Sequence, residues 1–266
     1  MLNLNSELLL KVSNISIKAG IKIMEYYLVD TDVKIKEDRS PLTKADLAAN
    51  DIIINELKLL DETIPILSEE SLVDWSERKK WDAYWLVDPL DGTKEFINKN
   101  GEFTVNIALI KNNTPVLGVI YSPVLSTLYY AQKHKGSFKI ISSKLMSTLD
   151  KSQKIYSNIK NKSDHILVIG SRSHSNDAFS TWIKNNFNEY EIIKKGSSLK
   201  FCQIAEGKAD IYPRFGLTSE WDIAAGHIIL EEAGGNVYTI DNRKITYNMK
   251  ENILNPEFFA SCKFID

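Results

Sequence analysis

Between residues 166 and 240 the chain alternates between short β-branched apolar runs and longer segments whose apolar residues have helical spacing. Runs of the first kind predict strands, and segments of the second kind predict helices. Strands that alternate with helices favour an α/β arrangement, in which helices cover a sheet. The expected strands are 166–170, 190–194, 209–213 and 236–240, and the expected helices begin near Ser175 and span 198–207 and 221–235.

The first half of the chain has a different pattern. Apolar residues recur at every third or fourth position from Leu8 to Ile23, and again from about Thr43 to Leu60, which predicts two amphipathic helices. Three β-rich runs then follow with short polar turns between them, which is typical of an antiparallel meander. They are residues 103–110, 115–123 and 127–132. We therefore expect an α+β first half, with helices packed on an antiparallel sheet.

A polar, lysine-rich stretch at residues 142–164 lies between these two patterns. Its composition favours a linker or a surface excursion between two halves. We place a domain boundary within it, so that residues 1–150 hold the N-terminal helices and antiparallel sheet, and residues 151–266 form a C-terminal α/β half. The fold class expected for the whole chain is α/β.

The charge balance limits the kinds of partner. The 266 residues include 33 Lys and Arg against 35 Asp and Glu, so no overall attraction to nucleic acid or to an anionic membrane is expected. The N-terminal leucine run is flanked by charges and is too short to span a bilayer, so we expect neither a secretory signal nor an integral membrane segment. A cytoplasmic protein is expected. Peripheral association with the inner face of the cell membrane stays open, and the sequence does not indicate an oligomeric state.

The chain contains only two cysteines, Cys202 and Cys262. Their wide separation in a chain without a secretory signal predicts neither a disulfide framework nor a zinc site. We expect both to be reduced and partly buried.

The segment "LVDPLDGTKEF", residues 86–96, places two acids directly after an apolar run. Pro89 cannot donate to a sheet ladder, so we expect the strand to end at Asp88 and a helix to begin near Thr93. Asp88 and Asp91 could then face one point together with the Leu90 carbonyl, and a hard cation such as magnesium, or manganese in its place, would relieve their repulsion. A plain turn followed by a helix cap would use the same residue types, and the segment alone leaves both interpretations open.

Three further acids lie at the edges of apolar elements. Glu69 follows the run "IPIL", Asp222 opens the long apolar segment after "TSEW", and Asp46 lies in "TKAD" at an expected helix start. Taken singly, such acids are typical of solvated faces or of first helical turns.

The motifs "LSEE", "DPLDGTKEF" nineteen residues later and the distal "WDIAAGHIILEEAGG" resemble the inositol monophosphatase superfamily of magnesium-dependent, lithium-sensitive phosphatases. The resemblance extends over nearly the full chain. It implies a layered αβαβα sandwich of the sugar-phosphatase and inositol monophosphatase type, with the site between the halves. It also implies two or three magnesium ions, with manganese as a substitute, held by Glu69, Asp88, the Leu90 carbonyl, Asp91 and Asp222.

By the same resemblance, Thr93, Asp46 and Glu69 would carry catalysis. Thr93, paired with Asp46, would help to hold and deprotonate the attacking water, and the metal ions would lower the pKa of that water. Most of the metal ligands would come from residues 1–150, whereas residues 151–266 would supply the substrate pocket and Asp222.

The substrate expectation rests on two departures from the inositol-specific members. This chain has "KEF" where they typically have "TNF", and Arg214 stands near the place of a glutamate before the distal "WD". A guanidinium suits a second phosphate, because it binds phosphate oxygens in a bidentate manner. Together with "GSRSH", "GSSLKFC" and "YPRFG", these segments are similar to the CysQ-type 3′(2′),5′-bisphosphate nucleotidases, a branch of that family.

That similarity implies removal of the 3′-phosphate from adenosine 3′,5′-bisphosphate, leaving AMP, with the phosphosulfate analogue as a further substrate and a role in sulfur metabolism. The substrate would be a small phosphorylated nucleotide. The substrate-binding residues expected from it are Gly92, Thr93, Lys94, Arg172, Gly196, Ser197, Ser198, Lys200, Arg214 and Asp222.

Other functions stay open or are disfavoured. An inositol or sugar phosphatase of the same fold is open, because fold alone does not fix substrate. A magnesium-dependent nucleotide sensor without turnover is a further alternative. The haloacid dehalogenase signature is disfavoured because two residues, and not one, separate Asp88 from Asp91. A P-loop kinase is disfavoured because the sequence lacks the glycine-rich phosphate-binding motif.

Overall fold

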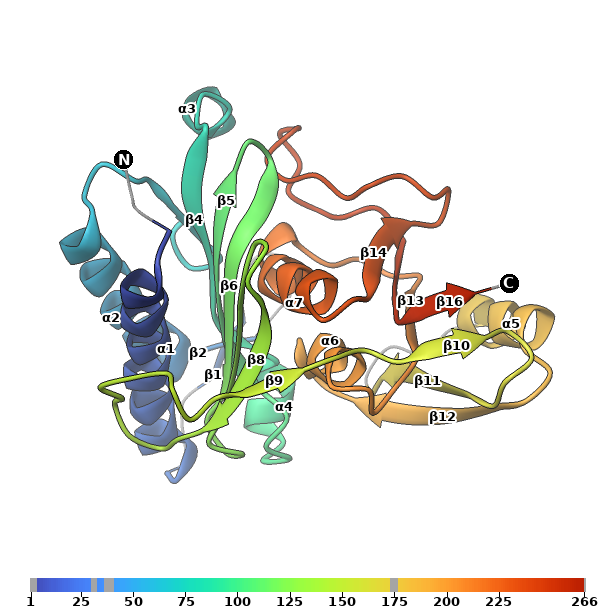
Figure 1. Ribbon diagram of the computed structural model, residues 1–266. Helices are drawn as coiled ribbons and strands as arrows, with labels where there is room; N and C mark the ends of the chain where they lie inside the picture. The colour runs from blue at the N-terminus through green and yellow to red at the C-terminus, as the bar shows by residue number, and fades with distance from the viewer. Residues whose placement is uncertain (1–3, 30–32, 36–40, 173–176, 266) are drawn as a thin grey trace.

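Two long helices cover one face of the larger sheet in the computed structural model, which describes residues 4–29, 33–35, 41–172 and 177–265 (Figure 1). They are α1, Ser6–Tyr27, and α2, Lys44–Leu60. The apolar stripe of each helix packs on strands of this sheet. The two helices expected from the apolar spacing are confirmed. The short pair β1, Val33–Ile35, and β2, Pro41–Thr43, precedes α2.

The larger sheet has seven strands in the order β3-β4-β5-β6-β7-β8-β9. All neighbours are antiparallel except β3 and β4, so the expected meander is confirmed. Short helix α3, Trp75–Arg78, joins β3 to β4, and α4, Thr93–Ile97, follows β4. The strands are β3 Ile66–Ser68, β4 Ala83–Asp91, β5 Thr104–Lys111, β6 Thr114–Ser122, β7 Thr127–Gln132, β8 Gly136–Ile141 and β9 Gln153–Ile155.

The smaller sheet has five strands in the order β12-β11-β13-β15-β14. The alternation expected for residues 166–240 is confirmed, although the start expected near Ser175 lies outside the described residues. The strands are β11 Ile166–Ser171, β12 Tyr190–Lys195, β13 Ile211–Arg214, β14 Asn236–Thr239 and β15 Phe258–Ser261, and the helices are α5 Asp177–Asn186, α6 Leu199–Ala205 and α7 Glu220–Glu232.

Helix α7 lies between the two sheets and is buried around most of its circumference (Figure 1). It contacts β5, β6 and β7 on one side and β14 on the other. A Cβ atom on Gly118 of β6 would lie 2.4 Å from a methyl carbon of Ile228, so only glycine allows this approach. Since α5 packs on the outer face of the smaller sheet, the layers run αβαβα, as the resemblance implied. This packing places the N-terminal end of α7 beside the large sheet.

Strand β4 corrects one expectation. It does not end at Asp88 but continues to Asp91, with Pro89 inside it. Asp88 pairs with Asn106 and Asp91 pairs with Thr104, so β4 holds one residue more than its partner in this interval. A bulge of this kind leaves a residue outside the ladder and thereby tolerates a proline that has no N–H to donate. It also re-aims the side chains around it.

The lysine-rich stretch between the halves contains two short strands that the sequence did not predict. Strand β9 pairs with β8 in the larger sheet, whereas β10, Ile159–Asn161, pairs with β16, Lys263–Ile265, beside the smaller one. The chain therefore crosses between the sheets within residues 155–159. The domain boundary at residue 150 stays a prediction.

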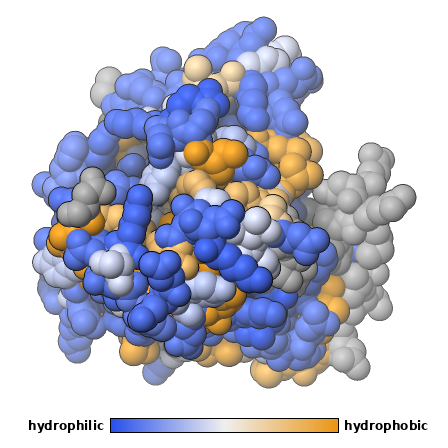
Figure 2. All heavy atoms as spheres, turned by 90° about the vertical axis from the view of Figure 1, so that its right-hand side faces the viewer, coloured by the Kyte–Doolittle hydropathy of each residue, from blue (hydrophilic) through white to orange (hydrophobic). Residues whose placement is uncertain are grey.

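Two other expectations concern the interior and the surface. Cys202 and Cys262 are both free and fully buried, more deeply than expected. No helix among the described residues is long and apolar enough to cross a membrane. On the face shown in Figure 2, hydrophilic residues cover most of the surface and hydrophobic ones are interspersed between them.

Candidate active site

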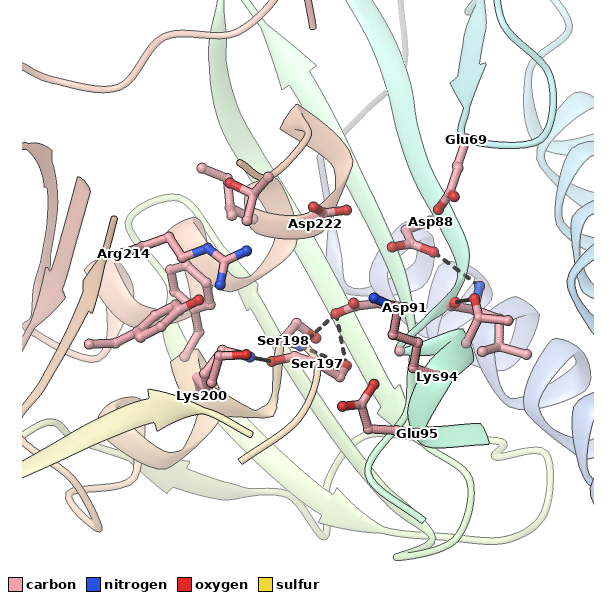
Figure 3. Close-up of a pocket in the computed structure, with 18 of the residues that line it drawn as sticks. Glu69, Asp88, Asp91, Lys94, Glu95, Ser197, Ser198, Lys200, Arg214 and Asp222 are labelled. Carbon is pink, nitrogen blue, oxygen red and sulfur yellow. Dashed lines mark hydrogen bonds between the residues drawn. The ribbon is translucent and has the colours of Figure 1, made fainter. Parts of the chain in front are cut away.

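A cavity of about 260 Å³ lies where the end of β4 and the start of α4 meet the first turns of α6 and α7 (Figure 3). Residues from both halves of the chain line it. From the first half these are Glu69, Asp88, Leu90, Asp91, Gly92, Thr93, Lys94 and Glu95, and from the second half Ser171, Ser197, Ser198, Lys200, Phe201, Tyr212, Arg214, Leu217, Thr218, Asp222 and Ile223.

Three carboxylates meet at one end of this cavity. Glu69, Asp88 and Asp222 each place a carboxylate oxygen within 4.8 Å of the others. Glu69 follows β3, and Asp88 is oriented by the Leu90 amide, which donates to its Oδ1 at 3.1 Å. Asp222 lies in the first turn of α7, where the Ser219 amide donates to its Oδ2 at 2.8 Å. The parallel pairing of β3 with β4 and the packing of α7 on the sheet bring the three together.

Burial and mutual repulsion raise the pKa values of two of these acids. Burial, followed by the charges of Glu69 and Asp91, raises the pKa of Asp88 well above its usual value. Burial, followed by Asp91 and Glu69, does the same to the pKa of Asp222. A bound cation would relieve both effects. Among the described residues the cavity lining contains carboxylates but neither histidine nor cysteine, so this donor set fits a hard divalent cation.

This crowding predicts how stability depends on pH without metal. The pKa of Asp88 is raised in the folded protein above the value of about 4 in an unfolded chain, so the folded state holds more protons between the two values. The free energy of unfolding therefore falls as the pH rises through this interval. We expect Asp88→Asn, which is uncharged at every pH, to become steadily more stable relative to the unmodified protein from about pH 4 toward neutrality. Thermal unfolding in a chelator measures this.

Asp61→Asn is the matched control for this series. Asp61 is partly exposed, and hydrogen bonds from Thr63 lower its pKa, so its removal should give no such gain. A stability difference between Asp88→Asn and the unmodified protein that stays constant with pH would contradict the expectation.

One oxygen of Asp91 is held by three donors. Its Oδ2 accepts from the Ser198 amide at 2.5 Å and from the Ser197 hydroxyl at 2.8 Å (Figure 3). It also accepts from the Asn106 amide group at 3.3 Å. Ser197 has a φ of 57°, in the left-handed region, and its hydroxyl also lies 2.5 Å from that of Thr104. A turn of the second half thus fixes a carboxylate of the first half.

Thr93, at the start of α4, and Asp46, in the first turn of α2, form a pair. The Thr93 hydroxyl donates to Asp46 Oδ1 at 3.2 Å, and it also lies 3.4 Å from the Leu90 carbonyl. Asp46 is not an exposed acid: it is 2% exposed and accepts from the amide of Thr43 at 2.8 Å in the capping box of α2. Burial raises the pKa of Asp46. Thr93 lines the cavity, and Asp46 lies behind it.

Two buried cations form the opposite wall of the cavity (Figure 3). Lys200 is 6% exposed, donates to the Ser197 carbonyl and lies 5.1 Å from the centre of the Tyr212 ring. Burial lowers its pKa to about 8, so it is mostly protonated at neutral pH. Arg214 is 9% exposed and donates to the carbonyls of Gly216 and Leu217 at 3.2 and 2.7 Å. The cavity therefore has an acidic end and a basic end.

Two expected substrate contacts do not line the cavity. Arg172 is half exposed, and its guanidinium donates to both oxygens of Glu102, at 3.0 and 2.9 Å. The Gly196 amide also donates to Glu102, at 2.8 Å. A carboxylate outside the cavity thus satisfies the flat, forked donors of the arginine. Direct substrate contacts by these two residues stay a prediction.

Several lining residues were not identified from the sequence. Glu95, 8% exposed, stands in the "KEF" that was singled out, but only its neighbour Lys94 was assigned to the site. Tyr212 and Phe201 lie in buried apolar segments, where an aromatic residue at a cavity cannot be distinguished from one in the core by spacing alone.

Known proteins resemble this chain over nearly its full length. The model of the inositol monophosphatase family matches residues 5–261. The 3′(2′),5′-bisphosphate nucleotidase CysQ of Salmonella typhimurium is 43% identical over 250 residues, which cover 93% of this chain and 97% of that protein. CysQ of Escherichia coli strain K12 is 41% identical over 253 residues, covering 94% and 98%.

A solved structure agrees with these sequence matches. The crystal structure of CysQ from Bacteroides thetaiotaomicron, described as a bacterial member of the inositol monophosphatase family, has a TM-score of 0.86 and 42% identity, with 98% of both chains covered. An inositol monophosphatase from Anabaena, at 23% identity and a TM-score of 0.73, shares the fold.

Proposed function

The chain belongs to the inositol monophosphatase family, and we propose that its cavity removes the 3′-phosphate of adenosine 3′,5′-bisphosphate, leaving AMP and phosphate. The activity is that of a 3′(2′),5′-bisphosphate nucleotidase, which relatives of about 40% identity share over nearly their full length. One observation carries the finer proposal: the cavity has a cluster of carboxylates at one end and two buried cations, Lys200 and Arg214, at the other. A substrate with two phosphates can use both ends at once.

The acidic end fits the divalent cations on which the family depends. We propose that Glu69, Asp88, the Leu90 carbonyl, Asp91 and Asp222 hold two or three magnesium ions, which manganese can replace. When bound, these ions activate the attacking water and neutralise charge that develops on the leaving oxygen.

The chain's own residues prepare this water. Since the Thr93 hydroxyl donates its proton to Asp46, its lone pairs are available to accept a hydrogen bond from a water in the cavity. Asp46 is in turn fixed by the capping box of α2, so the direction of the Thr93 proton is fixed as well. We expect Glu69, at the acidic end, to take part in withdrawing the proton from that water.

The basic end would bind the second phosphate. Lys200 and Arg214 are charged groups that the fold has already buried, so a phosphate reaching them makes hydrogen bonds of the strong, charge-assisted kind. Gly92, Lys94, Ser197 and Ser198 line the same cavity and are proposed as further contacts. An inositol monophosphate would leave Lys200 and Arg214 without an anionic partner.

Phosphate release by the purified protein with magnesium tests the proposal. We expect adenosine 3′,5′-bisphosphate and its phosphosulfate analogue to be hydrolysed faster than inositol 1-phosphate and fructose 1,6-bisphosphate. Equal or faster release from either of the last two would identify an inositol or sugar phosphatase instead. Binding of the nucleotide without any release would identify a sensor.

Lithium inhibition and a role in sulfur metabolism are expectations of the same proposal, and cytoplasmic location stays a prediction.

Arg214 allows a sharper test of the second-phosphate subsite. We expect Arg214→Ala to lower kcat/KM for adenosine 3′,5′-bisphosphate by about 10- to 100-fold, because a hydrogen bond to a charged group contributes about 1.5–3 kcal/mol. Adenosine 3′-monophosphate, which lacks the second phosphate, should be affected much less. Steady-state kinetics on both substrates measures the difference.

Arg243→Ala is the matched control, since Arg243 forms an exposed ion pair with Asp241 at 2.7 Å. It should leave both substrates unchanged. An equal loss on the two substrates in Arg214→Ala would refute the assignment of Arg214 to the second phosphate.

A further inference from the structure

Glu102 is an acid outside the cavity that accepts hydrogen bonds from three residues, in two segments of the second half of the chain. It lies between α4 and β5, and its side chain is 12% exposed. Its Oε1 accepts from Arg172 Nη2 at 2.9 Å and from Lys195 Nζ at 3.1 Å. Its Oε2 accepts from Arg172 Nε at 3.0 Å and from the Gly196 amide at 2.8 Å. We call these four residues the Glu102 cluster.

The cluster is a network and not a single surface ion pair. Burial raises the pKa of Glu102, but hydrogen bonds from Arg172, Gly196 and Lys195 outweigh this effect and hold the pKa below its usual value. An isolated exposed ion pair contributes little, whereas a bidentate arginine combined with further donors fixes a geometry. The carboxylate therefore stays charged and in one place.

What the cluster holds is the turn that orients Asp91. Gly196 is the first residue of this turn, and the next two, Ser197 and Ser198, donate to Asp91 Oδ2. The turn sits directly on the first half: a Cβ atom on Gly196 would lie 2.6 Å from Glu95 Cγ and 2.9 Å from the Glu102 carbonyl oxygen. A shift of Gly196 is therefore passed on to the donors of Asp91.

We propose that Glu102 is a positioning residue that, through Gly196, holds Asp91 in the orientation needed to bind a divalent cation, and that Arg172 acts through Glu102 and not on the substrate. The inference rests on the proposed cation-dependent phosphatase function. It gives a role to two residues that lie outside the cavity, and it assigns the alignment of a first-half ligand to an ionic contact between the halves.

Manganese binding to the metal-free protein tests this without relying on turnover. By isothermal titration calorimetry, Glu102→Ala should weaken Mn²⁺ binding by about 10- to 100-fold, as is typical when a group that orients a metal ligand is lost. In kinetics at saturating magnesium, KM for adenosine 3′,5′-bisphosphate should change by less than about threefold, because Glu102 does not touch the cavity.

Arg172→Ala separates the two possible roles of the arginine. It should weaken Mn²⁺ binding by a smaller factor than Glu102→Ala does, because Lys195 and Gly196 still donate to Glu102. The double variant Glu102→Ala/Arg172→Ala should bind Mn²⁺ no more weakly than Glu102→Ala alone, since Arg172 acts through a partner already removed. A rise in KM for the bisphosphate in Arg172→Ala, additive with Glu102→Ala, would overturn the proposal and return Arg172 to the substrate.

Two further variants complete the experiment. Glu56→Ala is the control, because Glu56 forms a half-exposed pair with Lys18 at 2.8 Å between α1 and α2, and it should leave Mn²⁺ binding unchanged. If Glu102→Ala does not fold, Glu102→Gln, which keeps the shape and one acceptor, should still weaken Mn²⁺ binding. Wild-type Mn²⁺ affinity in a folded Glu102 variant would overturn the proposal. Absence of Mn²⁺ binding by the unmodified protein would instead overturn the proposed function on which it rests.

Discussion

Replacing Asp91 by asparagine is expected to lower kcat for adenosine 3′,5′-bisphosphate by roughly a thousandfold or more, because metal-ion catalysis contributes several kcal/mol and each 1.36 kcal/mol is tenfold in rate. The asparagine amide oxygen can still accept from Ser197, Ser198 and Asn106, as Oδ2 does now. Its NH₂ group then takes the place of the second carboxylate oxygen, and an NH₂ group cannot ligate a cation. The turn is thus kept and the metal ligand is lost.

Single-turnover and steady-state assays at high magnesium measure this loss, and thermal unfolding in a chelator shows whether the fold is kept. Asp210→Asn is the control: Asp210 is also buried and accepts from a backbone amide and an asparagine side chain, at 2.9 and 2.8 Å, but lies outside the cavity. The folded Asp210→Asn protein should retain its turnover. Wild-type turnover in Asp91→Asn would refute the assignment of Asp91 as a metal ligand.

Loss of the Thr93–Asp46 pair is expected to have the second-largest effect, about 100-fold or more in kcat, the scale of positioned proton transfer. Thr93→Val keeps the side-chain shape but removes the hydroxyl that would accept from the attacking water. Asp46→Asn keeps an acceptor for the Thr43 capping box but can present NH₂ to Thr93. This NH₂ group would donate to the Thr93 hydroxyl, whose own proton would then point away from residue 46. The NH₂ group would thereby compete with the water for the hydroxyl oxygen.

The two single variants and their double variant should show similar losses, because the residues act as one unit. A pair of the same chemistry outside the cavity lining provides the control: the Thr63 hydroxyl donates to Asp61 at 2.6 Å. Thr63→Val and Asp61→Asn should retain full turnover. Losses in Thr93→Val and Asp46→Asn that simply multiply in the double variant would show that the two residues act separately.

The helices and the meander were predictable because their signals are local. The apolar residues of α1 and of α2 recur at helical spacing within one continuous segment each. The polar turns between β5, β6 and β7 are short. Strands β15 and β16 had no such neighbours in the sequence: each pairs with a strand that is distant along the chain. Their existence depends on the tertiary fold, which no window of sequence contains.

The candidate site also has features that were predictable from the sequence and features that only the tertiary fold determines. The resemblance indicated the acids that the fold brings together, Glu69, Asp88 and Asp222. The bulge that carries β4 past Pro89 could not be read from the sequence, because proline is also a common signal for the end of a strand. Arg172 was expected at the substrate because "GSRSH" resembles the bisphosphate nucleotidases. Its actual partner, Glu102, lies 70 positions away and is set by how the halves pack.

The central position of α7 has a consequence for how the chain is made. In the order of synthesis α7 comes after every strand of the larger sheet, yet it covers one apolar face of that sheet and carries Asp222. While the first half leaves the ribosome, that face has no cover, and Asp88 has no partner from the second half. We therefore expect the larger sheet to become stable only late in translation. A nascent chain that stalls before α7 should expose this apolar face and become a substrate for chaperones.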